Sequence, residues 1–318
     1  MLEPRRILVT GSTGMLGSAI VQNYQKNEPS VEIITDHNEE GIRLVDWTDW
    51  DESRIFMQNV GVTNITYFCA AHVGGIQANI DNGLKYYTIN SDIATNTIRA
   101  WNQYNDNRFV NISSSCIHSP WSQLVKPPFK PGDWKFNEPE DTNYGYAMAK
   151  REAINMMKVF KKYEEKKMVT MILPNLFGPG DTYEDNKSHF VAALIKRIYT
   201  AKKFKERFVG IWGDGSQVRE IMHVDDAAQQ IIRATSIPEV WKPDRDCINI
   251  SHGKKYTVKD VAETIRDVLK YEGFLYCDKE KPVGMQEKYM EAGEFMGTPK
   301  FETLAEEIYD TVKDLINE

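Results

Sequence analysis

A glycine-rich turn near the start of the chain constrains the fold more than any other feature of the sequence. Its spacing is GxxGxxG, and it lies between a strand-like run, Ile7–Thr10, and a helical pattern, Met15–Gln25. A strand, a tight turn and a helix in this order bring backbone N–H groups close to a diphosphate at the positive end of the helix. The turn therefore predicts a dinucleotide site. The residues expected to form it are Gly11, Thr13, Gly14, Met15 and Gly17.

Strand-like apolar runs alternate with helix-length patterns through the first half of the chain. The predicted strands are Ile7–Thr10, Val31–Thr35, Ile42–Val45, Thr66–Ala70, Phe109–Ser113 and Val169–Pro174. The helical patterns include Met15–Gln25, Leu84–Gln103 and Ala147–Tyr163. This alternation predicts an α/β fold with a Rossmann-type, doubly wound parallel sheet covered by helices on both faces. Such sheets bind ligands beyond the carboxyl ends of their strands.

The pattern loosens after Asn175, and the chain of 318 residues is long enough for a second lobe. We expect residues 1–175 to form a dinucleotide-binding domain and residues 176–318 a smaller, discontinuous substrate lobe. Within the second lobe, some segments of about residues 205–250 are expected to return to the sheet. The helix Asp225–Ala234 and the run Cys247–Leu269 are also expected to pack back onto it. Three loop-like segments are expected to close over a substrate. They are Leu176–Asn186, Gly210–Arg219 and Lys279–Gly297.

Composition excludes several classes of function. A net charge of −7 and a pI near 5.5 argue against a nucleic-acid surface. The sequence has no apolar run long enough for a membrane helix, and the strand-like run follows too soon after Met1 for a signal peptide. The four cysteines show neither CxxC nor zinc spacing, so we expect no metal site and a soluble protein with reduced thiols in the cytoplasm.

Two acidic residues lie where the adenosine half of a dinucleotide is expected. Asp36 follows the second predicted strand, where a carboxylate suits the ribose 2′-hydroxyl of NAD. The alternative interpretation is that Asp36 is only a polar residue of a loop. Asp46 follows the third predicted strand and is expected to approach the adenine.

A tyrosine and a lysine four residues apart form the first catalytic motif. Tyr146 and Lys150 lie in a helical pattern, so both side chains share one face. A nearby ammonium favours the phenolate, and we expect it to lower the pKa of Tyr146 from about 10. Tyr146 would then serve as an acid–base group near neutral pH. A chance surface pair is the alternative interpretation.

Hydroxyl and thiol groups follow the strand Phe109–Ser113, at the edge where a substrate is expected. Ser114 can donate a hydrogen bond to a carbonyl oxygen beside Tyr146. Cys116 lies two residues further along. Free cysteines are often buried as apolar filler, so the sequence leaves that role open for Cys116.

Titratable and cationic residues recur in the second half of the chain. His189 is expected to open a helix in which Lys196 and Arg197 lie on the same face as His189. His189 would then be an acid–base group, and the two cations beside it would bind a diphosphate. A solvated helix with an exposed histidine is the alternative. Trp212 and Arg219 supply a second candidate diphosphate contact. The run His223–Asp226 is expected to cap the next helix, a structural role.

With these residues identified, the chain resembles the GDP-L-fucose synthases. These are GDP-4-keto-6-deoxy-D-mannose 3,5-epimerase-4-reductases of the extended short-chain dehydrogenase/reductase superfamily. The resemblance runs from Arg6 to Ala234. It is carried by Ala70-Ala71-His72-Val73-Gly74-Gly75-Ile76, Ser114-Ser115-Cys116-Ile117, Tyr146-Ala147-Met148-Ala149-Lys150, Pro174-Asn175-Leu176-Phe177-Gly178-Pro179, Ser188-His189 and Arg219-Glu220.

The resemblance implies a role for each matching residue. Ser114, Tyr146 and Lys150 match a reductase triad, and Cys116 and His189 match an acid–base pair for epimerisation. Further cofactor contacts are implied for Ala70, Ala71, Pro174, Leu176 and His189. Contacts to the GDP-sugar are implied for Ser115, Asn175, Lys196, Arg197, Trp212 and Arg219. The resemblance also implies NADP(H) as cofactor, a GDP-linked 4-keto sugar as substrate and a homodimer.

Some positions depart from the family pattern. Basic residues expected near a cofactor 2′-phosphate are absent, and Thr13 and Asp36 keep NAD(H) open as an alternative. The segments Trp121–Trp134 and Lys281–Lys288 differ from the family, which leaves open whether the sugar is a hexose or a heptose.

Three rival functions share the fold. A 4,6-dehydratase is disfavoured because Ser115 and Cys116 stand where it needs an Asp-Glu pair. A nucleotide-sugar 4-reductase or 4-epimerase needs neither Cys116 nor His189 and remains open. A non-catalytic cofactor-binding protein is disfavoured because the triad is complete.

Overall fold

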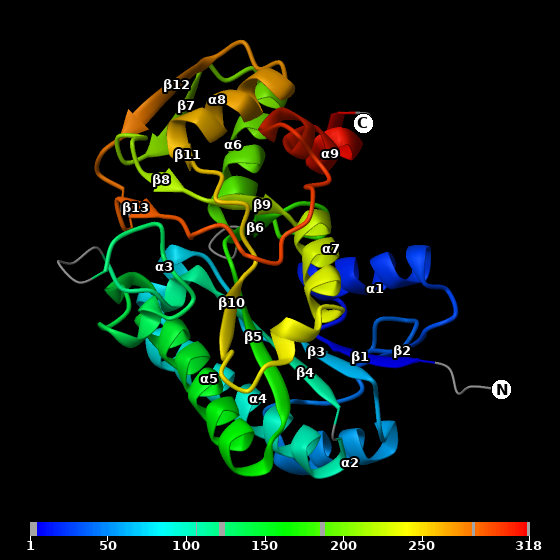
Figure 1. Ribbon diagram of the computed structural model, residues 1–318. Coiled ribbons are helices and arrows are strands. Elements are labelled where there is room, and N and C mark those ends of the chain that lie inside the picture. The colour runs from blue at the N-terminus through cyan, green and yellow to red at the C-terminus, as the bar shows by residue number, and fades with distance from the viewer. Residues whose placement is uncertain (1–4, 106, 121–124, 185–187, 282–283, 317–318) are drawn as a thin grey trace.

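The computed structural model describes residues 5–105, 107–120, 125–184, 188–281 and 284–316. Its centre is a six-stranded parallel sheet in the order β10-β5-β4-β3-β1-β2 (Figure 1). The strands are β1 (Arg6–Thr10), β2 (Glu32–Thr35), β3 (Ile65–Phe68), β4 (Arg108–Ser114), β5 (Lys167–Leu173) and β10 (Cys247–Asn249). The α/β prediction with a Rossmann-type, doubly wound sheet is confirmed.

Helices cover both faces of this sheet. One face packs against α1 (Met15–Asn27) and α7 (Val224–Thr235), which lie side by side in Figure 1. The other face packs against α2 (Trp50–Val60), α4 (Gly83–Tyr104) and α5 (Tyr144–Glu164). Every residue of β3 is buried, as is typical of a strand that is covered on both sides.

The strand order reverses beside β1, and this places the site. From β1 the chain passes to β2 on one side, and then to β3, β4 and β5 in turn on the other. The loops that follow β1 and β3 therefore diverge. A crevice forms between them, at the carboxyl ends of the strands.

A second lobe lies beyond that edge, at the top of Figure 1. Its helices α6 (Phe190–Phe204), α8 (Val258–Val268) and α9 (Leu304–Ile316) share one apolar core with β7 (Phe208–Trp212). Small sheets complete it: β7 with β12 (Phe274–Asp278), β8 (Val218–Arg219) with β11 (Tyr256–Thr257) and β13 (Glu287–Lys288), and β6 (Asn175–Phe177) with β9 (Ile221–His223). The remaining short helices are α3 (Ile76–Asp81), η1 (Ser115–Ile117), η2 (Asp133–Lys135), η3 (Asp141–Asn143) and η4 (Pro238–Trp241).

The structure corrects two expectations about elements. Ile42–Val45 is not a strand: it forms a loop with one bridge, His37 to Arg43, and Ile42 is 56% exposed. The second concerns the run Cys247–Leu269, because α8 lies within it and packs in the second lobe. Of residues 205–250, α7 packs on the central sheet and β10 joins it, while β7 pairs with β12. The division into domains at residue 175 stays a prediction.

Parts of three expected segments lie outside the described residues. They are residues 121–124 of the segment Trp121–Trp134, residues 185–187 around Asn186, and residues 282–283 of the segment Lys279–Gly297. Among the described helices, none combines the length and the apolar character that crossing a membrane requires.

Candidate active site

A cleft of about 1290 Å³ opens beyond the carboxyl ends of β1, β3, β4 and β5, with the second lobe forming its other wall. Pockets for a single small ligand usually measure about 300–1,000 Å³, so this cleft has room for two ligands. Every residue expected in the site lines it except Ser115. Ser115 is 2% exposed in η1, and its carbonyl accepts the His118 N–H. The expected contact between Ser115 and the sugar stays a prediction.

The glycine turn is built for close backbone approach. Gly11 has a φ of 64°, and a Cβ there would lie 2.7 Å from the Ala70 nitrogen. A Cβ on Gly17 would collide with the Gly11 carbonyl. No side chain caps the N-terminus of α1, whose first N–H groups are left for a ligand in the cleft.

Asp36 holds this turn in place. Its carboxylate accepts hydrogen bonds from the Gly11 N–H at 2.6 Å, the Ser12 N–H at 3.1 Å and the Trp47 indole at 2.9 Å. The Ser12 hydroxyl and the His37 ring add two more contacts. Burial alone would raise the pKa of Asp36, but these hydrogen bonds outweigh it and lower the pKa. Asp36 therefore positions the turn, which corrects the expectation that it binds a ribose hydroxyl.

Basic side chains do reach this end of the cleft, contrary to the expectation from sequence. His37 and Arg43 line it beside Thr13, with the His37 Nε2 3.5 Å from the Thr13 hydroxyl. The Arg43 guanidinium lies 4.0 Å from the Asp46 carboxylate and is largely exposed. The Asp46 carboxylate itself accepts the backbone N–H and hydroxyl of Thr48. This end of the cleft can hold an additional phosphate.

The serine, tyrosine and lysine of the expected triad come together from two elements. Ser114 is the last residue of β4, and Tyr146 and Lys150 lie in the first two turns of α5. The Lys150 ammonium donates to the Ile112 carbonyl at 2.9 Å and lies 5.8 Å from the centre of the Tyr146 ring. All three side chains line the cleft.

The pKa expected for Tyr146 is corrected by its surroundings. Burial, and then the nearby Cys116, raise the pKa of Tyr146 well above its usual value. Burial also lowers the pKa of Lys150 to about 8, and the net effect on the phenol remains a raised pKa despite the nearby ammonium. Tyr146 is a protonated phenol at neutral pH, suited to giving a proton rather than taking one.

Cys116 lies on the wall of the cleft and is not apolar filler. The Lys288 ammonium donates to its sulfur at 3.7 Å, and the Ser114 hydroxyl oxygen accepts the Cys116 N–H at 3.3 Å. Lys288 in turn lies 3.8 Å from the Glu140 carboxylate. Sequence reasoning missed both Lys288 and Glu140, because they come from segments far from Cys116 in the chain.

His189 is the N-cap of α6 and precedes the helix instead of lying within it. Its Nδ1 is 3.6 Å from the Asp181 carboxylate, so Nε2 is the nitrogen left for a ligand. Asp181 was also missed. The turn Gly178-Pro179-Gly180 just before it was the one available signal.

The candidate phosphate contacts lie along the second lobe. The cleft is lined by Lys196, Arg197, Trp212 and Arg219. Pro174, which follows β5, and Asn175 and Leu176 of β6 also line it. The Arg197 guanidinium donates to the Gly210 carbonyl at 2.6 Å and lies over the Trp212 ring. The Arg197 guanidinium is thus held against β7, which restricts how far it can move to bind a diphosphate.

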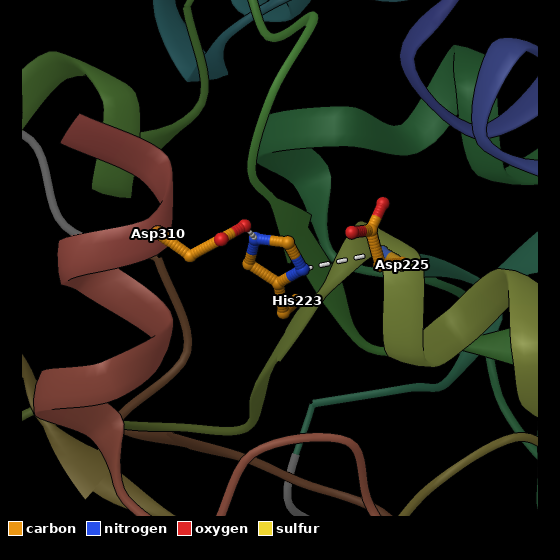
Figure 2. Close-up of side chains that lie close together, drawn as sticks. All are labelled: His223, Asp225 and Asp310. Carbon is orange, nitrogen blue, oxygen red and sulfur yellow. Dashed lines mark hydrogen bonds and ion pairs between the residues drawn. The ribbon is translucent and has the colours of Figure 1, made fainter. Parts of the chain in front are cut away.

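A second cluster of potential ligands lies apart from the cleft. Figure 2 shows His223 between Asp310 of α9 and Asp225 at the start of α7. The His223 Nδ1 accepts the Asp225 N–H at 3.2 Å, which confirms the expected capping role. Its Nε2 is 3.4 Å from Asp310, and the two carboxylates are paired with Lys300 and Lys313. The cluster therefore links α7 to α9 without requiring a metal.

Comparison with known proteins agrees with this geometry. The chain is 31% identical to the GDP-L-colitose synthase of Yersinia pseudotuberculosis, covering 90% of this chain and 89% of that protein. It is 30% identical to the GDP-L-fucose synthase of Escherichia coli K12, covering 91% and 89%. The crystal structure of a Naegleria fowleri GDP-L-fucose synthetase bound to NADP superposes with a TM-score of 0.82 at 19% identity, covering 100% and 95%.

The model of the NAD dependent epimerase/dehydratase family matches residues 7–250, which include the glycine turn and the three triad residues. The chain belongs to the NAD dependent epimerase/dehydratase family.

Proposed function

We propose that this protein epimerises C3 and C5 of a GDP-4-keto-6-deoxy sugar and reduces C4 with NADPH. The observation that carries the proposal is one cleft lined by a serine–tyrosine–lysine triad and by two further acid–base groups, Cys116 and His189. A simple 4-reductase has no use for that second pair. The relatives named above act, by their names, in the synthesis of GDP-linked colitose and fucose, which supports a GDP-sugar as substrate.

The described residues fit a dinucleotide. The glycine turn and the uncapped N-terminus of α1 suit a diphosphate, and Arg43 and His37 suit a 2′-phosphate nearby. Because Asp36 is committed to the turn, the structure supports NADPH over NADH. When bound, the reduced nicotinamide supplies the hydride.

Epimerisation needs acidic protons on the carbons beside the ketone and two groups to move them. The Ser114 hydroxyl and the Tyr146 phenol would donate to the C4 oxygen and stabilise the enolate that forms. One member of the Cys116–His189 pair takes a proton from a ring carbon, and the other returns a proton to the opposite face. Asp181 would hold the His189 ring during the transfer.

Reduction requires a proton for the new hydroxyl at C4. Tyr146 would give it, since burial keeps its phenol protonated. Lys150 lies one turn further along α5 and would hold a ribose hydroxyl of the cofactor while replenishing the proton. Arg219, Lys196 and Trp212 would hold the GDP half of the substrate along the second lobe.

We also propose that two copies associate through α4 and α5, in the cytoplasm. The two helices pack side by side and carry exposed apolar side chains, among them Leu84 at 77% and Val159 at 55% exposure. All four cysteines are free thiols, which supports a reducing compartment. Light scattering would measure the mass of the particle, and a monomer at micromolar concentration would contradict the association.

The proposed reaction is tested by product analysis. GDP-4-keto-6-deoxy-D-mannose is incubated in deuterated water with the protein and with NADPH or NADH, and the sugar is examined by NMR. We expect a hydroxyl at C4, deuterium at C3 and C5, and faster turnover with NADPH. A product reduced at C4 without deuterium would replace the proposal with a simple 4-reductase. No turnover of this sugar would remove it.

A further inference from the structure

Lys288 reaches the cleft from a distant part of the chain. It lies on β13, which pairs with β8 in the small three-stranded sheet, and its side chain is 9% exposed. The ammonium donates to the Cys116 sulfur at 3.7 Å. Burying an ammonium is costly unless it is paired, so its position requires an explanation.

Glu140 fixes that position. One of its carboxylate oxygens lies 3.8 Å from the Lys288 ammonium, and the other accepts the Met285 N–H at 2.8 Å. A Cβ on Gly284 would lie 2.6 Å from Glu140, so the close approach of this segment depends on a glycine. Glu140 also precedes η3 and α5, which carries Tyr146. It therefore ties β13 to the catalytic helix.

The charges around Cys116 are mostly positive. Lys288 of β13 and Arg219 of β8 face the thiol, while the carboxylate of Glu140 and the neutral phenol of Tyr146 lie nearby. Burial lowers the pKa of Arg219, while Glu140 and Cys116 act in the opposite direction. Cations this close to a sulfur favour its anionic form.

We propose that Lys288 is a positioning residue that stabilises Cys116 as a thiolate and so makes Cys116 the base of the acid–base pair. This rests on the proposed function. The thiolate takes a proton from a ring carbon and becomes a thiol, and the electron pair of the C–H bond passes to the enolate oxygen. A protonated His189 then returns a proton to that carbon from the other face and becomes neutral. Each epimerisation thus converts a thiolate and an imidazolium into a thiol and an imidazole, and proton exchange with water restores the pair before the second carbon reacts.

The test reads the thiolate directly, without the sugar. The complete protein and its Lys288→Met variant are alkylated with iodoacetamide from pH 5 to 10, and the rate at each cysteine is followed by mass spectrometry. We expect Cys116 to react about tenfold or more slowly at pH 7 in the variant, because a cation within about 4–6 Å is lost. The difference should vanish at high pH. Lys288→Arg should restore most of the rate.

Controls separate charge from folding. Exposed Cys277 is an internal reference, and Lys279→Met removes an exposed lysine from the same segment. The alkylation rate of Cys277 should be the same in every variant, and Lys279→Met should leave the alkylation rate of Cys116 unchanged. Glu140→Gln removes a negative charge and keeps an acceptor for the Met285 N–H, so it should hold or raise the rate. If Glu140→Gln and Lys288→Met slow alkylation equally at all pH values, Lys288 only maintains structure and the inference fails.

Failure of the inference and failure of the proposed function are distinguishable. Deuterium entering C3 and C5 through Cys116, with unchanged alkylation in Lys288→Met, would overturn the role of Lys288 alone. Slower alkylation in Lys288→Met with no deuterium exchange by the parent would leave the Lys288–Cys116 pairing in place and remove the reaction proposed above.

Discussion

Tyr146 illustrates how the surroundings of one side chain decide its chemistry. Its buried phenol keeps its proton at neutral pH, so we assign it the role of proton donor to the C4 oxygen. Tyr146→Phe removes that proton and is expected to lower kcat for reduction by about 10²–10⁴-fold. The Kd of NADPH, measured by fluorescence titration, should change little. A variant with parental kcat would exclude Tyr146 as the donor.

Arg43 tests the preference for the cofactor. Its largely exposed guanidinium lies 4.0 Å from the Asp46 carboxylate, at the end of the cleft expected to bind adenosine. Arg43→Ala should raise the Kd of NADPH by about tenfold, because one charge-assisted contact is lost. The Kd of NADH should stay nearly constant. Arg54→Ala is the control, since this half-buried arginine of α2 does not line the cleft. Equal weakening of both cofactors in Arg43→Ala would refute a 2′-phosphate contact.

The sequence revealed site residues where local motifs carry them and missed residues that long-range folding brings in. The glycine turn, Ser114 and the Tyr146–Lys150 pair each follow from strand and helix spacing. Lys288 reaches Cys116 only through the pairing of β13 with β8. Arg43 lies in a segment predicted as a strand, which instead forms a loop with a bridge to His37. No local periodicity encodes either approach.

At the scale of elements, the contact between the glycine turn and α1 is the tightest in the cofactor site. Gly17→Ala would push a Cβ into the Gly11 carbonyl and displace α1 from the turn. We expect the Kd of NADPH to rise at least about tenfold, with a loss of about 1–3 kcal/mol of stability from overpacking. Gly83→Ala at the start of α4 is the matched control, since a Cβ there meets nothing. Calorimetry gives both quantities, and similar behaviour of the two variants would contradict the steric argument.

Elements were predictable where their periodicity is strong and their neighbours are close in sequence. Within the first 175 residues, the predicted strands other than Ile42–Val45 fall close to their observed bounds, because their apolar side chains are buried in one sheet. The predicted helices also fall close to their observed bounds, because their apolar faces pack on that sheet. The strand predicted at Ile42–Val45 is wrong because this apolar run pairs with no strand of the sheet and forms a loop. The pairing of β7 with β12 joins segments that no local pattern relates.

For the whole molecule, stability depends on buried titratable groups remote from the cleft. Glu307 of α9 is 6% exposed, and burial raises its pKa from 4.5 to about 7. Its contribution to folding is therefore intact below pH 4.5 and is lost as the pH rises through 7, at a cost of at most about 3 kcal/mol. Glu307→Gln should raise the Tm at pH 8 and have little effect at pH 4.5. An equal shift at both pH values would exclude titration as the cause.

The account as a whole depends on Cys116 moving a ring proton in the same cleft where Tyr146 serves reduction. The most direct measurement is the rate at which deuterium from the solvent enters C3 and C5 of the GDP-4-keto sugar, compared between the parent and Cys116→Ser. We predict a loss of about 10²-fold or more in the variant, with the Kd of NADPH preserved. Deuterium entering both positions at the parental rate in Cys116→Ser would contradict the account.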